Sequence, residues 1–109
     1  MLLPFDPCPP TPNCHIEYVD VPASVDAVAS KMKPLLVQFG AYDLQHVKDG
    51  WDSAIDIFVF TDDLKIRHVT EGKGTRIWLR SSSRVGHWDL WVNRFRVKSF
   101  IRLLKNAFP

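Results

Sequence analysis

Apolar and polar residues alternate through most of the middle of the chain, which is the pattern of half-buried β-strands. Five segments have it: 15–21 (HIEYVDV), 42–47 (YDLQHV), 51–60 (WDSAIDIFVF), 64–69 (LKIRHV) and 75–84 (TRIWLRSSSR). The last four are separated by turn-forming segments, namely KDG at 48–50, TDD at 61–63 and TEGKG at 70–74. The sequence therefore predicts a meander of antiparallel strands with one face on the core.

Two other segments repeat their apolar residues at every third or fourth position, which is the spacing of an amphipathic helix. The first lies between Ser24, a favourable N-cap, and Gly40, a residue suited to end a helix. Its apolar face consists of Val25, Val28, Met32, Leu35, Leu36 and Phe39. The second extends from about residue 92 to 107, and Asp89 or Asn93 is placed to cap its start. Its apolar face consists of Val97, Phe100, Ile101, Leu104 and Phe108.

The order of these elements predicts an α+β domain, because both helices must cover an apolar face of the sheet. We expect a two-layer fold in the order β-α-β-β-β-β-α. In it, a curved antiparallel sheet of four to five strands packs with two helices, as in the helix-grip or TATA-binding-protein-like folds. Residues 1–14 form a proline-rich N-terminal arm, since they hold five of the eight prolines and proline removes backbone donors. Residues 15–109 then form a single α+β domain.

Charge is distributed unevenly, although the net charge is only +2. Residues 1–75 carry six Lys and Arg against eleven Asp and Glu, whereas residues 76–109 carry eight Lys and Arg against Asp89 alone. The basic segment either pairs with the acidic part of the same fold or binds an anionic partner. Pairing within the fold is the simpler interpretation, and nucleic acid is not an expected partner, because nucleic-acid binders usually have a higher overall pI.

No run of about 20 apolar residues occurs, so we expect no membrane span. The first ten residues, MLLPFDPCPP, also lack the charged and the long apolar regions of a signal peptide. These features predict a cytoplasmic protein, unless an export signal or an anchor precedes this sequence.

Three motifs occur together: CPPTPNC at 8–14, an Asp pair in FVFTDDLKI, and LRSSSRVGHWDLWVNRFRV at 79–97. With them the chain resembles, over nearly its whole length, an uncharacterised bacterial family catalogued as domain of unknown function 1499. The chain departs from the family pattern at residues 15–17, where a Val-Ser-Ser-like run is more usual, and at Trp91, where glycine is usual. The resemblance implies a shared fold and motif set and brings no known activity with it.

The arginine-rich segment allows two interpretations. Its donors are suited to phosphate or carboxylate, and the candidate ligand-binding residues are Arg80, Ser81, Ser83, Arg84, Asn93, Arg94 and Arg96. In the structural interpretation, the arginines pair with Asp62, Asp63 and Asp89 and fasten strand ends to the start of the last helix. The leading hypothesis is a non-catalytic domain that binds a small molecule or a protein through an anion-accepting, arginine-rich surface.

Two alternatives from other classes are a small enzyme or metal-binding protein that uses Asp62, Asp63 and His87, and a nucleic-acid binder that uses the basic final helix. No nucleophile, calcium-loop or phosphate-loop motif accompanies those residues, so we expect no catalytic residue, metal or cofactor. Trp88 and Trp91, if exposed, could support a homo-oligomer.

The two cysteines leave three states open. Cys8 and Cys14 could form a small-loop disulfide in an exported protein, or join His15 and a distant histidine in a zinc site. In the cytosol they would be free thiols that help to hold the arm.

Overall fold

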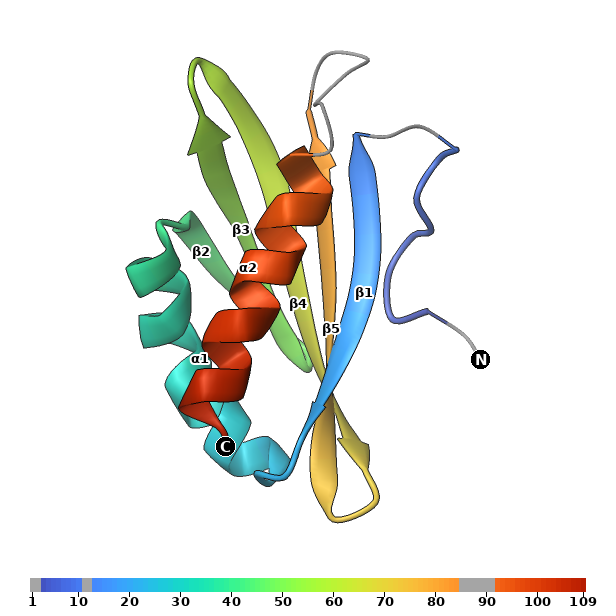
Figure 1. Cartoon of the computed structure of the whole chain (residues 1–109), viewed down its shortest axis with the longest axis vertical. Coiled ribbons are helices and arrows are strands. Elements are labelled where there is room, and N and C mark those ends of the chain that lie inside the picture. Colours follow the sequence, from blue (N-terminus) through green and yellow to red (C-terminus); the bar gives the residue numbers. More distant parts are fainter. Residues whose placement is uncertain (1–2, 11–12, 85–91) are drawn as a thin grey trace.

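The computed structural model describes residues 3–10, 13–84 and 92–109. Its elements are β1 (Cys14–Val21), α1 (Val25–Phe39), β2 (Tyr42–Val47), β3 (Gly50–Ile57), β4 (Phe60–Glu71), β5 (Gly74–Ser83) and α2 (Val92–Ala107). The strands form one antiparallel sheet in the order β1-β5-β4-β3-β2. The predicted α+β class, element order and curved antiparallel sheet of four to five strands are confirmed, and the sheet has five strands. Figure 1 shows α2 in front of the sheet and α1 to the left of α2.

The β3–β4 turn is displaced from its predicted position. The two-residue connection is Phe58–Val59, and the TDD segment at 61–63, predicted as a break, belongs to β4. Alternation of side chains along β4 therefore continues without interruption from Asp62. The turn was not predicted because Phe58 and Val59 are apolar and neither is a usual turn former.

The helices begin and end where local chemistry requires. Ser24 accepts a hydrogen bond from the amide of Ala27, which caps the start of α1. Gly40 ends α1 with a φ of 103°, in the left-handed region that other residues avoid. Asn93, predicted as a cap of the last helix, instead lies within α2 and is fully buried.

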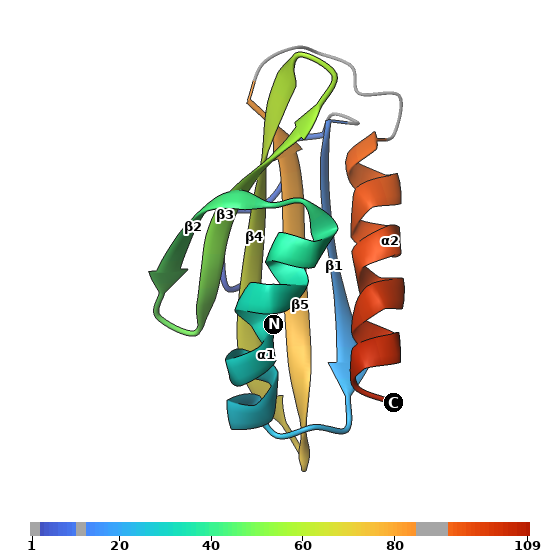
Figure 2. The same cartoon turned by 90° about the vertical axis from the view of Figure 1, so that its left-hand side faces the viewer.

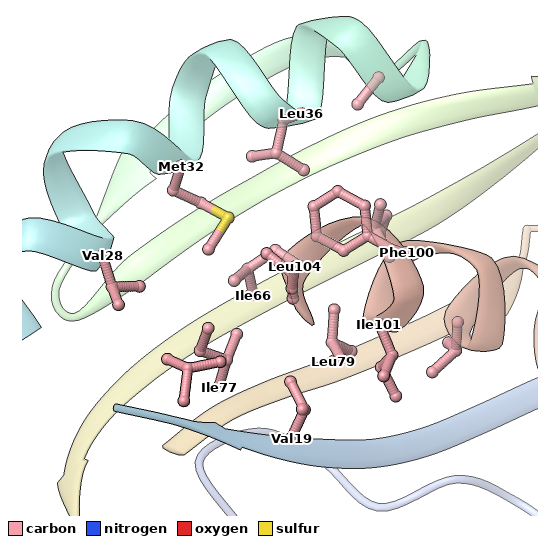
Figure 3. Close-up of a cluster of buried hydrophobic side chains, with 14 of the residues drawn as sticks. Val19, Val28, Met32, Leu36, Ile66, Ile77, Leu79, Phe100, Ile101 and Leu104 are labelled. Atoms are coloured by element: carbon pink, nitrogen blue, oxygen red, sulfur yellow. The ribbon is translucent and has the colours of Figure 1, made fainter. Parts of the chain in front are cut away.

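The hydrophobic core lies between the two helices and one face of the sheet. Met32 and Leu36 of α1 and Phe100 and Leu104 of α2 are fully buried there, and Figure 3 shows them facing strand residues such as Ile77. Figure 2 shows α2 running along the length of β1 and β5, its main strand contacts. Alternation places every second strand residue on this core face and the others on the opposite face, here called the outer face.

Candidate functional site

A buried polar cluster joins the start of α2 to the core face of the sheet. Arg96 donates through Nη1 to a carboxylate oxygen of Asp62, to Ser81 Oγ at 3.2 Å and to Asn93 Oδ1 at 3.2 Å. The side chains of Asp62 and Arg96 are 1% and 7% exposed. A buried charge pair of this kind is tolerable only when further hydrogen bonds surround it, as they do here.

Asn93 extends this cluster to two more segments. Its Oδ1 accepts from Ser81 Oγ, and its Nδ2 donates to Ser83 Oγ and to the backbone carbonyl of Asn13, both at 3.0 Å. The cluster therefore links α2, β4, β5 and the residue that precedes β1. Arg96, Ser81 and Asn93 were predicted as ligand donors, and in the structure they are buried and hydrogen-bonded to one another.

The second carboxylate of the Asp pair lies on the opposite side of the sheet. Because successive strand residues point to opposite faces, Asp63 lies on the outer face and binds Arg84, whose Nε and Nη2 approach Oδ1 at 3.0 and 2.9 Å. This hydrogen bond raises the pKa of Arg84 above its ordinary value. Asp62 and Asp63 therefore cannot act together on one substrate or metal ion.

Among residues 3–10, 13–84 and 92–109, Arg80 pairs with no carboxylate, and the ion pairs of Asp62 and Asp63 are made by Arg96 and Arg84 instead. The Nε of Arg80 donates to the carbonyl of Asp6 at 2.9 Å, and its Nη1 donates to Ser82 Oγ at 3.0 Å. The arm is thereby held against the outer face. A disulfide between Cys8 and Cys14 closes the arm onto the first residue of β1, so that neither thiol is free.

The outer face also carries a polar groove of about 290 Å³. It is lined by Asp43, Gln45, Asp52, Ser53, Ala54, Asp63, Lys65 and Arg84. A register shift between Tyr42 and Gln45 and a φ of 51° at Asp43 mark a bulge in β2 at the rim of the groove. Bulges turn side chains away from the regular pleat, which explains how Asp43 reaches the groove.

Most charges of the groove are paired within the protein. Asp63 binds Arg84, and Asp52 binds Arg67 at 2.8 Å. Among residues 3–10, 13–84 and 92–109, Lys65 and Asp43 make no ion pair. The groove therefore offers one cation and one anion that make no ion pair there, although the charge of Asp43 also acts on Arg84 and helps to raise its pKa. Sequence reasoning missed the groove, although the alternation of Asp63, Lys65 and Arg67 in β4 marks a charged outer face.

The remaining candidates lie elsewhere. Arg94 is exposed on α2, away from the groove lining. His87, Trp88, Asp89 and Trp91 lie outside the described residues, and with them the predicted oligomer contact. Within the described part of the chain, no three His, Cys, Asp or Glu side chains are grouped to hold a metal ion. Neither described helix combines the length and the hydropathy needed to cross a bilayer.

A match to a known protein family covers the strands and the helix that carry these sites. The family model described as Protein of unknown function (DUF1499) matches residues 51–104. The chain belongs to this family. The DUF1499 match extends from β3 to α2 and includes the buried Asp62–Arg96 pair as well as Asp63, Lys65 and Arg84.

No curated protein and no solved structure matches the chain. The DUF1499 description names no activity.

Proposed function

We propose that the protein is a non-catalytic binding domain that holds a small charged ligand in the groove on its outer face. The observation that carries this proposal is the presence of Lys65 in that groove without an ion-pair partner among the described residues. An ammonium group is a strong hydrogen-bond donor to carboxylate or phosphate. Arg84 lies in the same lining and adds a second cationic donor surface.

The charge balance of the groove favours a zwitterionic ligand over a simple anion. Once Asp63 is neutralised by Arg84 and Asp52 by Arg67, the remaining charges are those of Lys65 and Asp43. A ligand with an anionic group and an ammonium group complements both, whereas a simple anion would meet an unbalanced carboxylate. The small volume limits the ligand to a few heavy atoms beyond these two groups.

Titration followed by amide chemical shifts tests this assignment. O-Phosphoethanolamine serves as the zwitterionic probe, with inorganic phosphate and ethylamine as its two halves. We expect the zwitterion to bind more tightly than either half, and Lys65→Ala and Asp43→Asn each to weaken it by about tenfold, or roughly 1.4 kcal/mol. Asparagine is chosen at position 43 because it tolerates a positive φ.

Lys73→Ala is the matched control, because Lys73 is an exposed lysine in the β4–β5 turn outside the groove lining. Equal binding by Lys65→Ala, Lys73→Ala and the parent protein would exclude the groove as the site. A stronger response to phosphate alone than to the zwitterion would show that the ligand class is wrong.

We also propose that the protein works in an oxidising compartment, in place of the cytoplasmic location expected from the sequence. The support is the disulfide between Cys8 and Cys14, since small-loop disulfides persist where glutathione and thioredoxin do not reduce them. Rapid alkylation of the protein in its native cells, followed by mass spectrometry, measures the thiols directly. Unmodified cysteines are expected, and alkylation of both would place the protein in a reducing compartment.

A further inference from the structure

The β3–β4 turn presents apolar side chains to solvent. Phe58 and Val59 are 93% and 90% exposed, and Phe60 is half exposed. These three residues, here called the apolar tip, lie at the end of the β3–β4 hairpin, at one extremity of the long axis of the molecule (Figure 1). Such exposure of consecutive apolar residues carries a solubility cost, so it calls for a function.

The backbone of the turn strengthens this point. Phe58 has a φ of 54°, at the first position of a two-residue hairpin connection. Glycine or asparagine is usual at such positions, because a bulky residue is strained there. Neither the packing nor the turn geometry of the isolated protein therefore favours phenylalanine, and an observed outlier of this kind points to a use of the side chain.

Polar groups follow directly behind the tip. The hydroxyl of Tyr42 donates to Asp56 at 2.6 Å, and the hydroxyl of Thr61 donates to the same carboxylate oxygen at 2.9 Å. Both bonds lie one residue pair before the tip, at the Asp56–Thr61 pair of the hairpin. The apolar side chains of the tip are thus followed by a polar layer made of Asp56, Thr61 and the hydroxyl of Tyr42 from β2. This change from apolar to polar groups follows the polarity profile of a membrane interface.

We propose that the apolar tip inserts shallowly into the interface of a lipid bilayer. A protein partner is less well matched, because a stable interface buries about 800 Å² and about 20–30 residues on each side, whereas the tip offers three apolar residues on a narrow projection. A bilayer demands no complementary shape, and insertion gains the free energy of removing the exposed side chains from water.

The charges nearest the tip indicate which lipids it would bind. Arg84 lies close, since its amide donates to the Thr61 carbonyl at 3.4 Å, but its guanidinium is paired with Asp63. Asp56 adds a negative charge, and its bond from Tyr42 holds the pKa of that carboxyl below its usual range. Among the residues that the structure describes, no excess of cations surrounds the tip to attract anionic headgroups, so the bilayer that it fits is zwitterionic.

Sedimentation of the full chain with phosphatidylcholine vesicles tests this proposal. We expect measurable binding at millimolar lipid, little enhancement by phosphatidylglycerol and little effect of salt. The Phe58→Gly/Val59→Ser double variant should partition at least about tenfold less, because it loses the inserted side chains. Glycine suits the positive φ, so the variant should melt no lower than the parent. Val37→Ser, which removes an exposed apolar residue from α1, is the control and should bind as the parent does.

Three results would overturn the proposal. The first is that the parent does not sediment with phosphatidylcholine vesicles, and the second is that the double variant sediments as well as the parent. The third is that sedimentation without lipid shows a dimer that the double variant loses, because the tip would then be a contact between two copies of this chain.

Discussion

Replacement of Asp62 by asparagine tests whether the buried charge pair fastens α2 to the sheet. The substitution keeps the size and shape of the side chain but leaves the Arg96 guanidinium buried without its counter-charge. Removal of one partner of a buried pair typically costs about 3–5 kcal/mol. Because a domain of this size has a total stability of about 5–15 kcal/mol, the expected loss is a large part of the whole.

The chain supplies a matched control one residue away. Asp63→Asn breaks the pair with Arg84 on the outer face, where both side chains are substantially exposed to water. Solvent screens such pairs, so no change in stability beyond the scatter of the measurement is expected. The same substitution at two adjacent positions should therefore cause a large loss of stability at one and no measurable loss at the other. Because both variants change the net charge equally, net charge cannot explain the difference.

Urea unfolding followed by far-ultraviolet circular dichroism measures both variants. We expect a large fall in the midpoint for Asp62→Asn with little change in the slope of the transition. The double variant Asp62→Leu/Arg96→Met should recover most of the loss, since apolar replacement of a whole buried pair is often neutral or stabilising. Equal, small effects of Asp62→Asn and Asp63→Asn would refute the reasoning, because they would mean that water reaches Arg96.

Three further predictions concern single groups. Burial lowers the pKa of His68 to about 4, and its Nε2 has no hydrogen-bond partner among the described residues. The unfolded state therefore binds the additional proton between about pH 6.5 and 4, and stability should fall with decreasing pH across that window by at most about 1.4 kcal/mol per pH unit. Urea titrations at several pH values should show this component in the parent and not in His68→Leu. Gly50→Ala would place a Cβ 1.8 Å from the carbonyl oxygen of Ile66, so thermal unfolding should show a loss of at least about 1–3 kcal/mol. Reduction of the Cys8–Cys14 disulfide should speed amide exchange in the arm and leave exchange in β4 unchanged.

The elements that were predictable from sequence are those in which one face is buried along its whole length. In β4 and β5, Leu64 and Ile66 and then Ile77 and Leu79 are completely buried at every second position, as their alternation indicates. The register of such strands is strongly specified, since a slip of one residue would expose the entire apolar set. Burial of one strand face therefore produces an alternation of apolar and polar residues that can be recognised from the sequence alone.

Pairing of arginines with Asp62 and Asp63 was predictable, but which arginine binds which carboxylate was not, because these contacts join residues far apart in the chain. Asp62 and Arg96 are separated by 34 positions, and neither residue type by itself indicates burial. The turn at Phe58 was missed for the opposite reason: its apolar residues continue the strand pattern through a position where polar turn formers are usual. Rules based on neighbouring residues therefore predict neither the Asp62–Arg96 contact nor the turn at Phe58. Such rules are expected to fail where a residue serves tertiary contacts or function and not local structure.

The position of the arm follows from contacts on both faces of the sheet. On the core side, Asn93 binds the carbonyl of Asn13, and on the outer face Arg80 binds the carbonyl of Asp6. The arm is therefore held at two points on opposite faces of the sheet, near the end of the strand order where β1 pairs with β5. The disulfide shortens the arm between these points, and Phe5 lies over β4, with the guanidinium carbon of Arg67 5.8 Å from its ring centre. The motif that is most distinctive in the sequence therefore holds the arm against the outer face, while the core face of the same sheet is covered by the helices.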